Sequence, residues 1–118
     1  MELLHISKNL ENEGDKHVKT MLYNLTSAGV STKTIDHVGE TVHVEAWAHF
    51  KQEKRDGGEQ EVLAFITSDG EVFGTISATF INRFLDIYEI FGFEDFPEIE
   101  IIGGTSKNGR QFVTCRPA

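Results

Sequence analysis

The chain of 118 residues is poor in cysteine, with one, and in proline, with two. A single cysteine, Cys115, cannot form an internal disulfide, which favours a reducing compartment. No apolar run approaches the roughly 18 residues that a membrane-spanning helix needs, and the N-terminus lacks the basic-then-apolar pattern of a signal peptide. We therefore expect a cytoplasmic protein without membrane contact, folded as one domain over residues 1–118.

Positive charge is scarce as well, with 11 Lys and Arg against 19 Asp and Glu and a formal net charge of -8. A uniformly basic surface for sequence-independent duplex binding is therefore excluded. Six of the cations nevertheless fall in two short parts of the chain, which contain Lys51, Lys54, Arg55, Lys107, Arg110 and Arg116.

Enzyme motifs are missing too. The glycines of GGTSKNGR (residues 103–110) run from strand to strand, whereas a phosphate-cradling P-loop leads from a strand into a helix. His43 and Glu45 form the HxE of zinc deaminases, but one cysteine cannot supply the PCxxC that must follow. His43 and His49 lie about 20 Å apart along a strand, too far for one metal. We expect no enzyme, no catalytic residue, no metal site and no cofactor.

Two helices are predicted from apolar residues at i, i+3, i+4 and i+7. The first spans residues 15–28, with Asp15 as N-cap and Gly29 as its stop. The second spans residues 78–92, with Ser77 or Thr79 as N-cap and Gly92 at its end. Its predicted core residues are Phe80, Ile81, Phe84, Leu85, Tyr88 and Phe91.

Five strands are predicted, and residues 1–14 read as a polar lead-in. The alternating residues 41–51 are predicted to form the first strand. Its buried face consists of Val42, Val44, Ala46, Ala48 and Phe50. A charged loop over residues 52–60 and a tight turn at Asp69-Gly70 separate the next strands. The other four strands span residues 62–68, 71–77, 98–102 and 110–116.

Three meandering strands, a helix and a final hairpin are the element order of the OB-fold, a five-stranded Greek-key barrel, here with an additional N-terminal helix. A ferredoxin-like fold needs a strand before the first helix, and an SH3-like barrel has no place for the central helix. In an OB-fold, the loops at residues 52–60 and 103–109 flank one binding face. Because the cations gather at these loops, the face suits a polyanion.

Flat side chains on such a face stack on unpaired bases. Trp47 shares strand parity with His43, Glu45 and Lys51, so we predict that it is exposed and stacks. Phe73 and Phe112 are either core residues or further stacking platforms. Lys54 and Arg55 either contact phosphates or belong to a solvated loop whose charge is cancelled by acidic neighbours.

The stretch 103–110 is predicted to be both a hairpin tip and a ligand contact. Asn108-Gly109 is the pair that a type I′ turn requires. Gly103 and Gly104 allow close approach of backbone or of a phosphate, and the hydroxyls of Thr105 and Ser106 can donate to phosphate oxygens. Lys107 and Arg110 add charge beside the turn.

Three segments together resemble a known family: LYNLT (22–26), SDGEVFGTISATFINRFLDIYEIFG (68–92) and GTSKNGRQFVTC (104–115). They look like the small single-stranded DNA-binding proteins of bacteriophages of Gram-positive bacteria, of the lactococcal phage type. The resemblance implies an OB-fold, sequence-independent binding, a role in phage replication or recombination, and a homodimer. It also implies that Lys107 and Arg110 contact the strand.

The resulting hypothesis is a non-enzymatic single-stranded DNA-binding protein. The predicted contacts are Trp47, Lys51, Lys54, Arg55, Phe73, Lys107, Arg110, Phe112 and Arg116. Recombinase or replication proteins are candidate partners. The alternative is an OB-fold accessory that binds such proteins and has little DNA affinity, in keeping with the net charge of -8.

Overall fold

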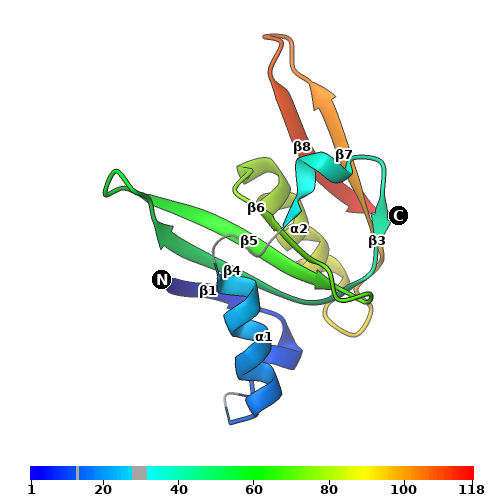
Figure 1. Cartoon of the computed structure of the whole chain (residues 1–118). Helices are drawn as coiled ribbons and strands as arrows, with labels where there is room; N and C mark the ends of the chain where they lie inside the picture. Colours follow the sequence, from blue (N-terminus) through cyan, green and yellow to red (C-terminus); the bar gives the residue numbers. More distant parts are fainter. Residues whose placement is uncertain (13, 28–31) are drawn as a thin grey trace.

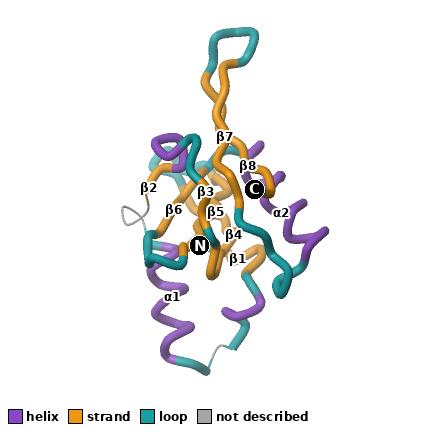
Figure 2. Tube along the Cα trace, turned by 90° about the vertical axis from the view of Figure 1, so that its right-hand side faces the viewer, coloured by secondary structure: helices purple, strands orange, loops and turns teal. Residues whose placement is uncertain are grey.

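The computed structural model describes residues 1–12, 14–27 and 32–118, and it is mainly β, with two helices (Figures 1 and 2). The helices are α1 (Lys16–Thr26) and α2 (Ala78–Phe91), with short 3-10 turns η1 (Lys8–Leu10) and η2 (Thr34–His37). The strands are β1 (Glu2–Ile6), β2 (Thr32–Lys33), β3 (Thr41–Val42), β4 (Val44–Glu53), β5 (Glu59–Thr67), β6 (Val72–Thr75), β7 (Ile99–Thr105) and β8 (Gln111–Pro117).

The strands form two sheets. One has the order β1-β4-β5-β6-β2, in which β2 runs parallel to β6, and the other has the order β3-β7-β8. Only His43 separates β3 from β4, so the segment 41–53 pairs with β7 through β3 and with β5 through β4. This one long segment joins the two sheets.

The predicted order of three strands, a helix and a hairpin is confirmed as β4-β5-β6, α2 and β7-β8. The closed five-stranded barrel is not: among the described residues, no ladder joins β6 to β8. At that gap the Ser77 hydroxyl donates to the Val113 carbonyl, 3.1 Å away. The two hairpins, β4-β5 and β7-β8, extend from the body in different directions (Figure 1).

The larger sheet is covered on both faces. One face packs on α2 and the smaller sheet around Trp47, Phe65, Phe73 and Phe84. The other face packs on α1 and η1 and contributes the small or apolar residues Ala46, Ala48, Phe50 and Ala64. Burial on both faces is what the continuous apolar run in β5 requires.

A bulge in β4 and the burial of both its faces overturn the prediction that Trp47 is exposed. A β-bulge between Val44 and Ala46 shifts the register against β5. Val44 therefore packs on the sheet face that α2 covers, and Ala46 packs on the face that α1 covers. Trp47 then lies on the α2 face, where its ring meets Phe84 and Tyr88 edge to face and retains 3% exposure. The bulge therefore splits the predicted buried face, since Val42 and Val44 lie on the side of Trp47 and Ala46, Ala48 and Phe50 on the other, and both faces are buried.

The N-terminal segment is not a polar lead-in. Strand β1 pairs antiparallel with β4, the Trp47 amide donates to the Ser7 hydroxyl at 3.1 Å, and Leu10 is fully buried under α1. The His49 ring joins β1 to β5, because its Nδ1 lies 3.1 Å from Nδ1 of His5 and its Nε2 lies 2.8 Å from a Glu61 carboxylate oxygen. The sequence did not predict β1, because its five residues, Glu2–Ile6, are too few to show the alternating pattern of a strand.

Both helices begin where predicted. The Asp15 carboxylate accepts from the His17 amide at 2.8 Å, and the Ser77 hydroxyl accepts from the Phe80 amide at 3.3 Å. Gly92, at φ 74°, ends α2. The predicted end of the first helix, Ala28 and Gly29, lies outside the described residues.

The buried stripe of α2 is Phe80, Ile81, Phe84 and Ile87. Three of these were predicted. Leu85 and Tyr88 lie at the flank of this stripe and are only partly buried, and Phe91 is exposed at the last residue of the helix. The inward position of Cys115 is confirmed, and burial raises the pKa of its thiol to about 12.

Candidate nucleic-acid interface

Three hairpin turns share one design, a tight turn that ends on a glycine in the left-handed region. Gly57, Gly70 and Gly109 have φ values of 88°, 88° and 77°. In the last of these turns the Gly109 amide donates to the Ser106 carbonyl at 2.9 Å, and the Ser106 amide donates to the Arg110 carbonyl at 2.8 Å. These bonds define a three-residue loop with a glycine bulge.

The predicted type I′ turn at Asn108-Gly109 is therefore wrong. A type I′ turn needs positive φ at both residues, and among the described residues only glycines have positive φ. The glycine bulge also lets β7 and β8 continue to Thr105 and Gln111. In the same way, β4 and β5 run into the predicted 52–60 loop and reduce it to residues 54–58.

A groove of about 640 Å³ opens between the two long hairpins, and we call it the hairpin groove. The β4-β5 hairpin lines it with Gln52, Gln60 and Val62, and the β7-β8 hairpin lines it with residues 111–113. Residues 33–35 and 74–77 complete its walls. A smaller hollow of about 310 Å³ shares Gln60 and Ile76 with it and extends to Lys54.

Phe112 is the aromatic side chain of the hairpin groove. Its cross-strand partner is Gly104, and a Cβ atom added at that glycine would lie 2.5 Å from Cζ of the Phe112 ring. The ring therefore lies directly over the glycine backbone, in space that any other residue would occupy. Phe112 remains 40% exposed, so a large flat surface is presented at the mouth of the groove.

Gly103 has a similar role. A Cβ atom there would lie 2.8 Å from a methyl carbon of Val38, which follows η2. The adjacent Gly39 amide donates to the Ile101 carbonyl at 2.8 Å and holds this segment on β7. The two glycines thus make room for the side chains of Val38 and Phe112.

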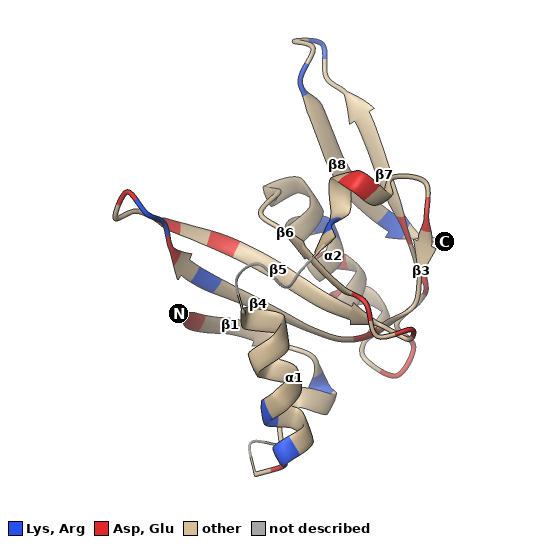
Figure 3. Ribbon diagram, in the orientation of Figure 1, with Lys and Arg blue, Asp and Glu red and all other residues tan. Residues whose placement is uncertain are grey.

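Cations lie at the tips of both hairpins, and the β4-β5 tip carries acidic residues as well (Figure 3). Lys54 and Arg55 belong to the β4-β5 turn, and Lys107 and Arg110 to the β7-β8 turn; all four are exposed. Within the described part of the chain, none of the four takes part in an ion pair. Acidic residues gather around the β5-β6 turn and the α2-β7 loop, away from the β7-β8 tip (Figure 3).

The other two predicted cations are differently placed. The Arg116 side chain donates to one Glu100 carboxylate oxygen through Nε at 2.9 Å and Nη2 at 2.8 Å, so its charge is already balanced. Lys51 is flanked across the sheet by Glu2 and Glu61, and strand alternation turns it away from the groove face of Gln52. Neither residue lines the hairpin groove.

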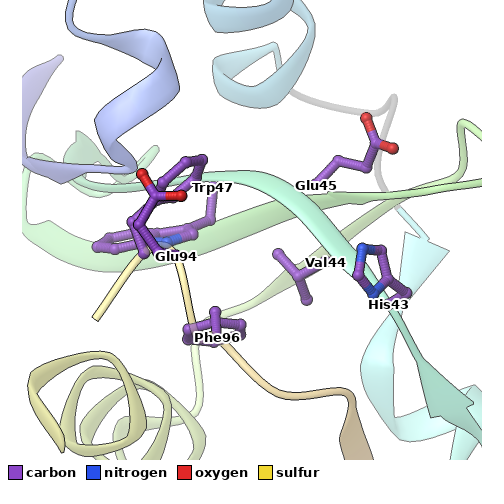
Figure 4. Close-up of a pocket in the computed structure, with 7 residues that line it drawn as sticks. His43, Val44, Glu45, Trp47, Glu94 and Phe96 are labelled. Carbon is purple, nitrogen blue, oxygen red and sulfur yellow. The ribbon is translucent and has the colours of Figure 1, made fainter. Parts of the chain in front are cut away.

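Trp47 and Phe73 also lie outside the hairpin groove. Phe73 is 1% exposed and stacks on Phe65 in the core, with ring centroids 5.2 Å apart. Trp47 contributes to the walls of two other cavities, one of about 470 Å³ beside β1 and α2 and one of about 290 Å³, which Figure 4 shows with His43, Val44 and Phe96. Because the carboxylates of Glu45 and Glu94 also line that cavity, it is unsuited to a polyanion.

Sequence reasoning missed most of the groove floor. Ile35 and Ile76 are 37% and 64% exposed and line it. The sequence could not predict their exposure, because Ile76 follows the end of β6 and Ile35 lies in η2, where neither the strand nor the helix period applies. The three glutamines that line the groove, Gln52, Gln60 and Gln111, belong to no recognisable sequence motif.

Residues 1–12, 14–27 and 32–118 contain no group of three or more His, Cys, Asp or Glu side chains placed to hold a metal ion. Neither described helix is long and apolar enough to cross a membrane.

Comparison with known proteins agrees with the geometry. The family model described as phage single-stranded DNA-binding protein, of the phi29 type, matches residues 7–116. No curated protein and no solved structure matches the chain. Because the family match spans nearly the whole chain, from η1 to β8, this protein belongs to the phage single-stranded DNA-binding protein family.

Proposed function

We propose that the protein binds single-stranded DNA in the hairpin groove without requiring a particular sequence. The observation that carries the proposal is the seating of Phe112 over Gly104, between two hairpin tips that carry unpaired cations. An aromatic surface with cations on both sides is the usual arrangement for single-strand binding, in which bases stack and the backbone follows the charge. Family membership supports the same ligand.

In this proposal the phosphates meet Lys107 and Arg110 at one tip and Lys54 and Arg55 at the other. The bases turn inward, and one of them stacks on Phe112. Trp47 and Phe73 contribute by holding the core beneath the groove rather than by touching DNA. Lys51 and Arg116, whose charges face acidic neighbours, do not contact DNA in this proposal.

The fold proposed for this function is an open form of the OB-fold. The element order and the pairing of the segment 41–53 with both β5 and β7 support it. The hairpin groove lies at the unclosed side, where Ser77 reaches Val113. A barrel left open there leaves the edge of β8 and the Phe112 ring accessible.

The biological setting is proposed from the family, which is a phage family. We propose that the protein protects single strands during phage replication or recombination, in the cytoplasm of the host. The GTSKNGR ending favours the lactococcal phage type. Recombinase or replication proteins are the proposed partners.

A homodimer is proposed as well. Ile90 and Phe91 at the end of α2 are 77% and 39% exposed, and adjacent exposed apolar side chains are common at interfaces. Ile87, by contrast, is buried in the core and does not contribute. Light scattering at micromolar concentration should give twice the chain mass of 13.3 kDa; a value equal to one chain would refute the dimer.

The binding proposal is tested by titrating labelled oligo-dT, a duplex of the same length and a matching RNA at several salt concentrations. We expect salt-dependent binding to the single strand and much weaker binding to the duplex. Failure to bind oligo-dT at low salt would refute it and favour the protein-binding accessory, which the net charge of -8 supports. The RNA arm decides whether the groove accepts a 2′-hydroxyl.

A further inference from the structure

The chain has three glutamines, Gln52, Gln60 and Gln111, and all three line the hairpin groove. Gln52 and Gln60 are cross-strand neighbours on the β4-β5 hairpin. Gln111 begins β8 on the other hairpin, opposite Thr105. Segments about 50 residues apart in the chain therefore bring the same functional group to one groove from two sides.

The walls of the hairpin groove are nearly uncharged, in contrast to the cations at its tips. The chain carries 11 basic and 19 acidic residues, yet Lys33 is the one charged residue among the described residues that line the groove. The remaining lining is apolar, hydroxyl or amide. A phosphate would find little to neutralise it on these walls, so the backbone of a bound strand belongs at the tips.

The three amides are also available. The hydrogen bonds among the described residues involve none of these side chains. Gln52 and Gln60 are half-buried, and Gln111 is exposed. Each amide offers two N–H donors and one carbonyl acceptor, so each can satisfy either a donor or an acceptor on a ligand.

We propose that these three amides bond to the edges of unpaired bases, so that the hairpin groove recognises bases while the hairpin tips hold the backbone. The inference rests on the proposed function, because it assigns contacts within the same groove. Base edges carry both donors and acceptors, and an amide can turn to present either. The contact is therefore tolerant of sequence, but it requires that the edges are not already paired in a duplex.

The test compares two ligands of equal length and charge, oligo-dT and an oligonucleotide of abasic residues. The variants are Gln52→Leu, Gln60→Leu and Gln111→Leu, singly and together, because leucine keeps the size of the side chain and removes its polar atoms. Asn24→Leu, which removes an amide from α1 outside the groove, is the matched control. Thermal melts followed by Trp47 fluorescence establish that each variant is folded.

Each single variant should weaken oligo-dT binding by about two- to ten-fold, the effect of one net hydrogen bond. Binding of the abasic strand and the slope of log affinity against log salt should stay as in the wild type, since no charge is changed. The control should bind both ligands normally. Should the triple variant not fold, the exposed Gln111→Leu alone decides the outcome.

Two results would overturn the inference while leaving the proposed function intact. An equal loss on both ligands would mean that the amides contact the backbone. Unchanged affinity for both would mean that they contact nothing. Failure of the wild type to bind oligo-dT is a different result and refutes the proposed function itself.

Discussion

The Phe112 ring over Gly104 permits a test in which a stacking platform is moved rather than removed. Changing Phe112 to Ala deletes the ring, and each base-aromatic stack contributes about 1–3 kcal/mol. We expect oligo-dT binding to weaken by about five- to 150-fold. The cost in stability should stay well below the about 3–5 kcal/mol of a buried Phe, because the side chain is 40% exposed.

The Gly104→Ala variant keeps the Phe112 ring but places a Cβ atom in the space that the ring occupies. The new Cβ would lie 2.5 Å from Cζ, against at least 3.4 Å in an ordinary contact, so the ring must move by about 1 Å or more. An exposed ring at the end of a rotatable side chain can move at little cost in folding free energy. We therefore expect a near-native melting temperature together with part of the affinity loss of the Phe112→Ala variant.

Gly103→Ala is the matched control, because its Cβ would meet the methyl groups of Val38 instead of the Phe112 ring. The assay is fluorescence anisotropy of end-labelled oligo-dT at one fixed salt concentration, beside thermal melts of each variant. Native affinity in the Phe112→Ala variant would refute the role of the ring. Equal losses in the Gly103 and Gly104 variants would show that the hairpin backbone matters and the ring position does not.

Three further predictions use other parts of the molecule. The double change Lys107→Ala with Arg110→Ala should reduce the magnitude of the slope of log affinity against log salt by about 1.4, at 0.7 per lost phosphate contact. The control Arg116→Gln should leave that slope nearly unchanged, because the Arg116 charge is paired. An unaltered slope in the double variant would exclude phosphate contacts at this tip. Trp47→Ala should destabilise the fold by about 3–5 kcal/mol in denaturant titrations, and wild-type Trp47 fluorescence should not be quenched by oligo-dT, so strong quenching would contradict its burial. Cys115 should resist thiol reagents in the native protein at pH 8, since its thiol stays protonated below a pKa of about 12 and the chain must unfold to expose it; rapid native labelling would count against the core packing.

Local signals in the sequence determined the elements that depend on near neighbours. Asp15, Ser77 and Gly92 mark helix boundaries through hydrogen bonds that span two to four residues, and these were predicted correctly. The order of three strands, a helix and a hairpin follows from periodicity and turn residues. The resemblance in residues 22–26, 68–92 and 104–115 indicated a phage single-stranded DNA-binding protein, and the comparison confirms that family, whereas the lactococcal type stays a prediction.

Tertiary structure decided which face of each element is covered, since that depends on partners distant in the chain. Alternation in residues 41–51 reveals two faces, but α1 and α2 bury both, and the bulge beside Glu45 exchanges them. Trp47 therefore lies in the core and not at the interface where the sequence predicted it. The same pairing of distant segments gathered three glutamines and Phe112 around one groove, and no local pattern contains that information because the two hairpins meet only in the folded chain.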